Sequence, residues 1–486
     1  MPSEHSNASG ESSPVIDAGL LSPVSVGYDE DLSDAVFALH LVTAEVALVR
    51  AWALTGVAPA AAADAVEAVY GFSEPGSRAE PGIGPDSGTG PDADLGAGFG
   101  ALDLPGLARA AVAGGNPVIP LVGLMRGSVP EHARSWVHRG ATSQDIMDTA
   151  LMLLARDAGI GLLATLDEIE DVLAVFAERH RDLVAAARTL TQHAVPTTVG
   201  LRAANWARGV RRAALKLDLA LEQLPVQLAG AGGTLASFVE IGGREAAEEL
   251  PAAYAELLGL AAPEGPWHTV RWPVTELGDA LVQAVDALGV IAADVATLSR
   301  TEIGELAEGA GGGSSAMPQK SNPAGSVLIR SAAIRAPQLA ATLHAAAALA
   351  VDERPDGAWH AEWQTLRELL RLACGAAGHT ATLVSGLRVD EAAVARNLAL
   401  TGGLIVAERL SIELGPLIGA DRLKRIFAAA GRGASLVDLL RAEPELDGVD
   451  IAALIDPAGY TGLAGRLVDR LADSDALIDR AEEEPP

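Results

Sequence analysis

The sequence predicts an all-α protein, and three observations support this prediction. Apolar residues recur every three or four positions along most of the chain, as in helices that bury one face, whereas the alternation typical of strands is nearly absent. Hydrophobic residues make up 49% of the 486 residues, yet there are only 7 Trp, 4 Tyr and 6 Phe, so Ala, Leu and Val must form the core. Such a core favours closely packed helices over an aromatic-rich β-sandwich.

The first part of the chain is predicted to form an N-terminal helical domain over residues 25–140. Residues 1–24 are polar and lack any period, which predicts a disordered tail. Helical periodicity then runs from Asp31 to Tyr70, with a break at Gly56–Pro59. Residues 71–100 are so rich in Gly and Pro that we expect a flexible surface insertion rather than packed helix.

The central domain, residues 141–375, is expected to contain the longest helices. Its helical pattern runs from Asp145 to about Leu224, with interruptions predicted at Gly159–Gly161 and at Thr189–Gly200. Helices of this length with Ala and Leu on several sides cannot be covered by the shorter helices of one chain. We therefore expect an obligate oligomer. The remainder, residues 376–486, is assigned to a C-terminal helical domain.

Composition excludes several classes of function. The chain has 64 acidic and 35 basic residues and a net charge of −29, so it is expected to repel nucleic acid. Its one cysteine, Cys374, excludes an internal disulfide framework and a thiolate zinc cluster, and it fits a reducing, cytoplasmic location. No signal peptide is visible, and the apolar run Leu339–Val351 is too short to span a bilayer. We expect a soluble cytoplasmic protein with neither nucleic acid nor membrane as a partner.

The clearest candidate site is the glycine-rich segment 309–323, with the sequence GAGGGSSAMPQKSNP. Its glycines predict a mobile loop whose backbone N–H groups are open to an anion. A phosphate-binding P-loop is the competing interpretation, but Lys320 follows Gln rather than Gly and the preceding segment is helical. A solvated linker with incidental serines is the other alternative. The hydroxyl of Ser314, the cation of Lys320 and the amide of Asn322 favour a lid that closes over a carboxylate.

A second candidate site lies in Trp136–Asp145 (WVHRGATSQD), just before a predicted long helix. The hydroxyls of Thr142 and Ser143, with the free N–H groups of a helix N-terminus, can bind a carboxylate. The alternative is that these residues are ordinary N-caps. Upstream, Asn116 lies in a tight turn that could present its amide to the same ligand.

Five further candidate residues carry amide, imidazole or guanidinium groups that could also bind a carboxylate. Two of them follow a predicted helix break, where the histidine is a candidate for catalysis, although a lone histidine is more often structural. The others lie beside four of the seven tryptophans, which is typical of a walled polar pocket, with simple packing as the alternative. These candidates are Gln192, His193, His268, Arg271 and Arg354. Since neither a metal-ligand spacing nor a dinucleotide fingerprint is present, we predict a site for a small polycarboxylate that works without metal or cofactor.

The segment Gly313–Pro323 resembles the signature loop of the fumarase/aspartase superfamily. Within it, the chain is most similar to the branch that cyclises 3-carboxy-cis,cis-muconate in aromatic catabolism (the β-ketoadipate pathway). The resemblance covers about residues 30–70 and 105–475. The supporting segments are His138–Asp145, Pro266–Thr269, Gly357–Trp363, Asn397–Gly403 and Asp456–Gly462.

The resemblance implies a three-domain subunit whose long central helices assemble a homotetramer around a twenty-helix core. Each active site would be shared between subunits. By motif position, Ser314 would be the catalytic base on the loop, and Lys320 and Asn322 would bind one substrate carboxylate. Thr142 and Ser143 would bind another. Arg354 and Gln192 also match substrate-contacting positions.

Departures from the superfamily pattern bear on the substrate. Leu190 stands where many of its lyases carry a histidine, which fits the cycloisomerase branch and leaves His193 as a candidate acid. Arg139 replaces a common aromatic residue, and Ser321 stands where cycloisomerases often carry Arg. We predict lactonisation of 3-carboxy-cis,cis-muconate to 4-carboxymuconolactone. The alternatives are a sister lyase that eliminates a β-substituent from a substituted succinate, and a non-catalytic helical scaffold, which the intact loop disfavours.

Overall fold

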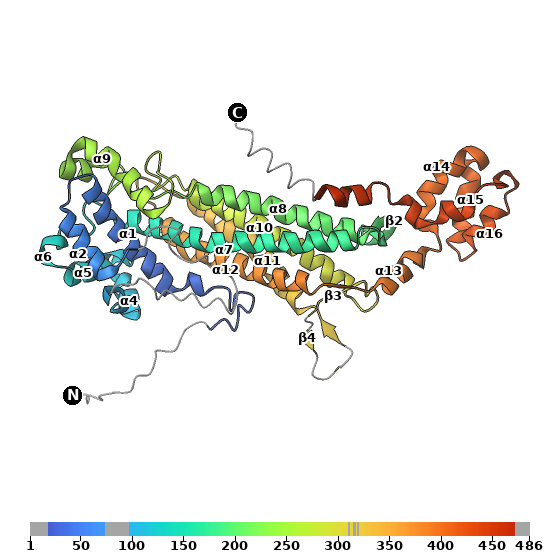
Figure 1. The fold of residues 1–486 in the computed structure, drawn as a ribbon, viewed down its shortest axis with the longest axis horizontal. Helices are drawn as coiled ribbons and strands as arrows, with labels where there is room; N and C mark the ends of the chain where they lie inside the picture. Colours follow the sequence, from blue (N-terminus) through green and yellow to red (C-terminus); the bar gives the residue numbers. More distant parts are fainter. Residues whose placement is uncertain (1–17, 73–96, 310–311, 314–316, 318–319, 472–486) are drawn as a thin grey trace.

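Five long helices run side by side through the middle of the molecule (Figure 1). The computed structural model describes residues 18–72, 97–309, 312–313, 317 and 320–471. Ala, Leu and Val side chains fill the space between these helices, so the predicted all-α fold is confirmed. The helices are α7 (Ser143–Arg179), α8 (Val199–Glu222), α10 (Trp272–Leu298), α11 (Ala324–Ala348) and α12 (Ala358–Ser385).

A second hydrophobic core lies at one end of the bundle. Trp52, Phe238 and Tyr254 are fully buried in it. The last two come from α9 (Ala236–Leu258), which belongs to the expected central domain by sequence but packs against α1. The other helices of this end are α1 (Asp34–Leu54), α2 (Ala60–Tyr70), α3 (Ala97–Gly100), α4 (Leu104–Gly114), α5 (Val118–Ser128) and α6 (Glu131–Arg134).

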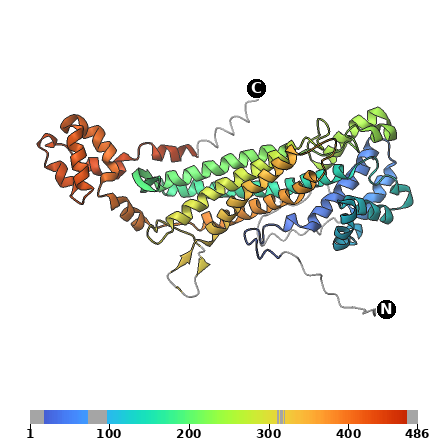
Figure 2. The ribbon, with the colours of Figure 1, turned by 180° about the vertical axis from the view of Figure 1, so that it is seen from behind.

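A third core, containing Leu410 and Leu440, lies at the opposite end of the bundle (Figure 2). The boundary expected at residue 375 falls inside α12, which continues to Ser385 because its residues 372–377 are buried in the bundle core. The α-helices of this end are α13 (Glu391–Leu398), α14 (Ala407–Ile418), α15 (Ala420–Ala430), α16 (Leu436–Arg441) and α17 (Ile451–Ile455). The 3-10 helices Ala399–Thr401, Leu404–Val406, Pro444–Leu446 and Pro457–Tyr460 belong to the same end, whereas Glu30–Leu32 lies before α1.

The interruption predicted at Gly159–Gly161 was wrong, because α7 runs through it without a break. Gly159 lies where the side chain of Leu221 on α8 approaches the α7 backbone, and a Cβ atom there would collide with it. Close packing of the two helices therefore outweighs the roughly 1 kcal/mol by which glycine disfavours a helix.

The second predicted interruption is a β-hairpin. Strands β1 (Val184–Thr189) and β2 (Gln192–Thr198) pair antiparallel, and Leu190 and Thr191 form a tight turn with φ of 48° and 71°. Two shorter ladders pair β3 (Leu306–Ala307) with β6 (Arg388–Val389), and β4 (Gly312–Gly313) with β5 (Ser321–Asn322).

Two segments expected to be irregular contain packed residues. Val24, in the predicted disordered tail, is buried, and its carbonyl lies against Gly375 of α12, where a side chain would not fit. Residues 97–100 of the predicted insertion form α3. These two expectations were wrong at those positions. Residues 1–17 and 73–96 lie outside the described residues.

Three helices, α1, α7 and α10, are long and apolar enough to cross a membrane by length and composition alone. Most of the apolar stretch of α1 and of α7 is buried inside the protein, which accounts for its composition. Less than half of the corresponding stretch of α10 is buried within the single chain.

Candidate active site

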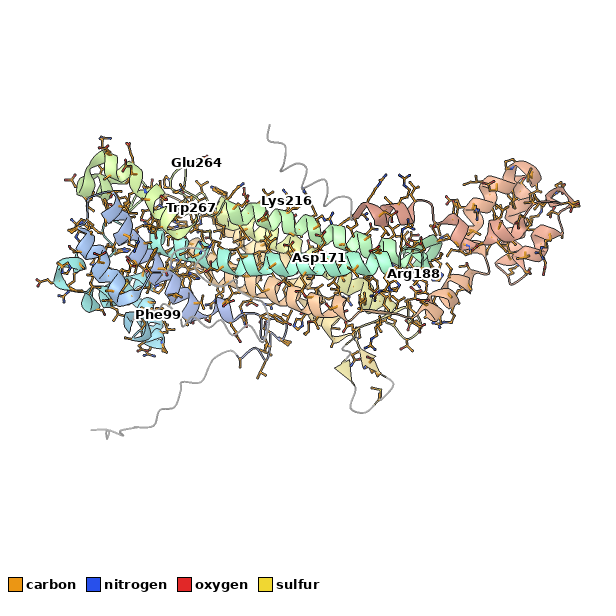
Figure 3. All side chains as sticks on the ribbon, in the orientation of Figure 1. Phe99, Asp171, Arg188, Lys216, Glu264 and Trp267 are labelled. Carbon is orange, nitrogen blue, oxygen red and sulfur yellow. The ribbon has the colours of Figure 1, made fainter. Side chains whose placement is uncertain are left out.

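The predicted site residues lie at two opposite ends of the central bundle. Thr142 and Ser143 stand at the start of α7, whereas Gln192 and His193 lie on the hairpin beyond its end. A helix of 37 residues is about 55 Å long at 1.5 Å per residue. Figure 3 shows the labelled Trp267 and Arg188 toward opposite ends of the central bundle. One chain therefore does not bring all of these residues together.

Asp145 organises the first end of the site. Its buried carboxylate accepts the N–H of Thr142 at 3.0 Å, which caps α7, and the N–H groups of Ala229 and Gly230 at 3.1 and 3.0 Å. It also lies 2.9 Å from His268 Nε2. His268 is only 3% exposed, so the expectation that it contacts substrate is corrected: it is a buried partner of Asp145.

Arg271 is also buried rather than open to substrate. Its side chain is completely inaccessible and donates to both oxygens of Asp148 (2.7 and 3.1 Å) and to Glu362 (2.7 Å). Its guanidinium lies 4.7 Å from the centre of the Trp267 ring. The prediction that Arg271 contacts substrate was wrong, because two carboxylates already occupy its donors. Burial raises the pKa of Glu362 although Arg271 opposes this rise.

The cations Arg354 and Arg139 remain half-exposed at this end. Arg354 donates to the carbonyl of Ala231 at 2.9 Å, within the turn that Asp145 holds, so Thr142 and Arg354 converge there. Arg139 lies over Trp136, 4.8 Å from its ring centre.

The amide of Asn116 is buried and bonded to its own turn, with its oxygen accepting the N–H of Val118 at 3.1 Å and its nitrogen donating to Gly114. The expectation that Asn116 presents its amide to a ligand is therefore corrected. His360 holds this turn against the start of α12, since its Nε2 lies 3.0 Å from the carbonyl of Gly115.

At the other end, the hairpin carries Gln192, which is exposed, and His193, which is half-buried and faces Arg188 across the ladder. Burial and the Arg188 charge lower the pKa of His193, which favours the neutral imidazole, a form suited to accept a proton, over the protonated form that the predicted acid needs. Arg188 is itself bound by Glu305, at 3.0 Å, and Glu305 also accepts from Asn397 at 2.8 Å.

Asp145, Glu305 and Asn397 were not among the predicted site residues. Each acts by holding other groups of the protein, and except for the bond from Thr142 to Asp145 these partners are distant in sequence. The acid at the first turn of a helix was the signal available for Asp145.

The glycine-rich loop is fixed at its base. Gly312–Gly313 pairs with Ser321–Asn322, and the Glu308 carboxylate accepts the N–H groups of Gly325 and Ser326 at 3.1 and 2.8 Å where α11 begins. Lys320 is exposed and Asn322 half-exposed. The predicted base Ser314 lies outside the described residues.

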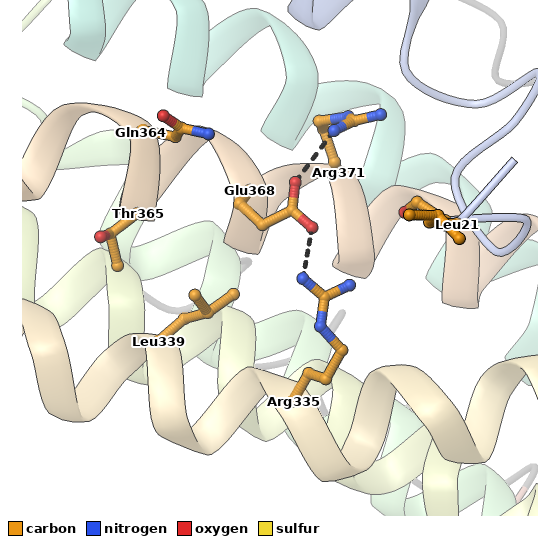
Figure 4. A pocket seen from close by; sticks show the side chains of 8 residues that line it. Leu21, Arg335, Leu339, Gln364, Thr365, Glu368 and Arg371 are labelled. Carbon is orange, nitrogen blue, oxygen red and sulfur yellow. Dashed lines mark hydrogen bonds and ion pairs between the residues drawn. The ribbon is translucent and has the colours of Figure 1, made fainter. Parts of the chain in front are cut away.

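A surface cavity of about 460 Å³ lies between α11, α12 and Leu21 (Figure 4). Two arginines line this cavity, and Glu368 accepts a hydrogen bond from each: from Arg335 at 2.7 Å and from Arg371 at 2.9 Å. None of the predicted site residues lines this cavity. Within the described part of the chain, no three His, Cys, Asp or Glu side chains are grouped as a metal site would require.

Comparison with known proteins identifies the class to which this fold and site belong. A family model described as lyase matches residues 112–337. A nitrosuccinate lyase of Streptomyces davaonensis is 44% identical over 482 residues, which is 95% of this chain and 96% of that protein. A 3-carboxy-cis,cis-muconate cycloisomerase of Pseudomonas aeruginosa is 40% identical, over 89% of this chain and 91% of that protein.

The crystal structure of the 3-carboxy-cis,cis-muconate lactonizing enzyme from Pseudomonas putida superposes with a TM-score of 0.79 at 34% identity, covering 93% of this chain and 96% of that one. The chain belongs to the fumarase/aspartase superfamily. It is an enzyme of that superfamily, a lyase or a cycloisomerase.

Proposed function

We propose that the protein is a lyase that eliminates a β-substituent from a substituted succinate, with nitrosuccinate as the substrate and fumarate and nitrite as the products. The observation that carries this proposal is the match to nitrosuccinate lyase, which extends over 95% of the chain at 44% identity, against 89% at 40% for the cycloisomerase. This reverses the order of preference that the sequence motifs gave.

The reaction balances without a further reactant. A base takes the proton from the carbon next to one carboxylate, and the electrons of that C–H bond pass into that carboxylate as an aci-dianion. They then form the C=C bond of fumarate, while the C–N bond breaks and its electron pair leaves with the nitro group as nitrite. The site must therefore stabilise extra negative charge during the reaction.

The exposed and half-exposed polar groups suit this task. Arg139 and Arg354, with the start of α7 at Thr142, would bind one carboxylate. Lys320 and Asn322, from the loop that carries Ser314, would bind the other. Serine is a poor base in water, so loop N–H groups and Lys320 must favour its alkoxide in a closed site. In a chain of net charge −29, cations kept at these positions support an anionic substrate.

We also propose that four chains assemble with each active site shared between subunits. A single site that contains both groups would take the second group from another chain, because about 55 Å separates them within one chain. The bundle also leaves apolar side chains outside: Val290, Val327 and Ile334 are 57, 56 and 73% exposed. Light scattering should give a mass near four times 49.6 kDa.

Cycloisomerisation of 3-carboxy-cis,cis-muconate is the second candidate function, and the structural likeness to the Pseudomonas putida enzyme favours it. In that reaction a carboxylate of the substrate adds to its own diene and closes a lactone ring, so the ultraviolet absorbance of the diene falls.

A product assay tests the proposal. Purified protein is incubated with nitrosuccinate, and fumarate and nitrite are measured in the same sample, with Ser314→Ala as the control. We expect equal amounts of both products from the wild type and none above background from the variant. A parallel sample contains 3-carboxy-cis,cis-muconate, and its ultraviolet absorbance is followed. A fall in that absorbance, with no nitrite from nitrosuccinate, would establish the second candidate instead.

A further inference from the structure

His138 forms a buried ion pair next to the proposed carboxylate site. Its Nδ1 lies 2.6 Å from Oε1 of Glu45 on α1, and the two side chains are 16% and 0% exposed. The backbone of His138 has φ of 58°, in the left-handed region that residues other than glycine rarely adopt. His138 directly precedes Arg139, so a side chain held at this position constrains the backbone that carries a proposed substrate contact.

Glu45 needs this partner. A fully buried carboxylate is strongly unfavourable unless a cation or hydrogen-bond donors compensate it. Within the described residues, Oε2 of Glu45 has no hydrogen-bond partner, so the compensation falls on Oε1 and His138. The same contact stabilises the strained backbone of His138. If His138 relaxed to an ordinary backbone conformation, the carboxylate of Glu45 would remain in an apolar surrounding without its partner.

The neighbouring backbone is also held by other contacts, which include the bond from the Thr142 N–H to Asp145 and the bond from Arg126 to the Val137 carbonyl at 2.9 Å. Trp52 Nε1 donates to the carbonyl of Arg139 at 3.0 Å, and Ser237 Oγ donates to the carbonyl of Gly140 at 2.7 Å. Both donors hold carbonyl groups, and neither holds a side chain of the segment. The His138 side chain therefore adds a side-chain anchor to these backbone contacts.

We propose that His138 is a positioning residue, whose ion pair with Glu45 holds segment 138–142 so that Arg139 and Thr142 face the substrate carboxylate. The inference rests on the proposed function, because these two residues are substrate contacts only there. His138 itself does not contact the reacting atoms.

The ion pair makes this positioning dependent on pH. Burial lowers the pKa of His138, but the charge and hydrogen bond of Glu45, together with the charge of Asp145, outweigh burial and raise it above its ordinary value, while Arg126 opposes the rise. His138 therefore keeps its proton to a higher pH than an exposed histidine does. The ion pair is lost as the pH rises through the raised pKa, and the contribution to substrate binding is lost with it.

Two variants and one control test the inference. His138→Asn removes the cation but keeps a residue that tolerates positive φ, and Glu45→Gln keeps the shape of the acceptor without its charge. The control is His132→Asn, an exposed histidine of α6. KM and kcat are measured from pH 6 to 9, and tryptophan fluorescence is recorded over the same range, because Trp136 packs against Arg139.

We expect His138→Asn to raise KM about tenfold at pH 7, as for loss of a charged hydrogen bond, with a much smaller change in kcat. The wild-type KM should rise with pH, that of His138→Asn should be flat, and Glu45→Gln should move the rise to lower pH. A wild-type KM profile in His138→Asn, or a lower melting temperature without any change in KM, would overturn the inference.

The fluorescence readout separates this inference from the proposed function. If the wild type forms no nitrite, the proposed function fails. A fluorescence transition with pH in the wild type that is absent from His138→Asn then still supports the coupling of His138 to the segment, and an identical transition in both proteins overturns it.

Discussion

Replacing Arg271 by methionine tests the electrostatics of the buried network under the first end of the site. The change keeps the apolar length of the side chain but removes the guanidinium. It leaves the carboxylates of Asp148 and Glu362, which are 0% and 2% exposed, without a cation. Breaking a buried ion pair in this way costs about 3–5 kcal/mol. The loss of contact with the Trp267 ring, 4.7 Å away, adds to that cost.

The cost should depend on pH in a definite direction. Burial already raises the pKa of Glu362 while Arg271 opposes the rise, so removing Arg271 raises that pKa further. A carboxyl group whose pKa is raised by folding destabilises the folded state increasingly as the pH rises through the interval between its unfolded and folded pKa values. The variant should therefore lose more stability at pH 8 than at pH 5.5.

Urea unfolding at the two pH values measures this effect. The matched control is Arg335→Met, which breaks the half-exposed pair of Arg335 and Glu368 and should cost less than about 1 kcal/mol. Adding Glu362→Gln to Arg271→Met should restore part of the stability. An Arg271→Met protein within about 1 kcal/mol of the wild type at pH 8 would refute the reasoning, since a buried unpaired charge cannot be that inexpensive.

Three further predictions follow from the site and the packing. Lys320 and Arg354 lie at opposite ends of α11, which is about 37 Å long, so a site that contains both takes them from different chains. Arg354→Ala and Lys320→Ala should each be inactive, yet co-expression should restore about a quarter of wild-type turnover, because mixed tetramers contain some sites with both native residues; no recovery would contradict a shared site. The activity of the wild type should fall as the pH drops through the lowered pKa of His193, and His193→Gln should lack this acid limb; identical profiles would exclude His193. Gly159→Leu should lower the melting temperature by several degrees, because its side chain collides with Leu221; an unchanged melting temperature would contradict the packing argument.

The sequence predicted the helical class and the long helices because these depend on local periodicity. It failed at Gly159, where a glycine that resembles a break serves a close helix contact with Leu221. It also missed the hairpin at Val184–Thr198, whose short strands contain alanines and an arginine rather than an alternating apolar pattern. In both cases the deciding contact lies elsewhere in the chain.

The candidate site was predicted by residue type, and residue type does not distinguish a substrate contact from a buried network. Arg271 and His268 carry the groups that a polycarboxylate site needs, but Asp148, Glu362 and Asp145 occupy them inside the protein. These partners lie about a hundred residues away in sequence, so no local pattern reveals the pairing. Arg139 and Arg354 remained half-exposed.

The relative kcat/KM for nitrosuccinate and for 3-carboxy-cis,cis-muconate, measured on one preparation at one pH, tests the central claim most directly. We expect nitrosuccinate to be preferred by at least about a hundredfold. A site whose polar groups match the carboxylates and nitro group of nitrosuccinate leaves some of those groups unpaired when the muconate is bound. The ratio should be unaffected by added chelator. A preference for the muconate, with fumarate and nitrite absent from the nitrosuccinate reaction, would contradict the account.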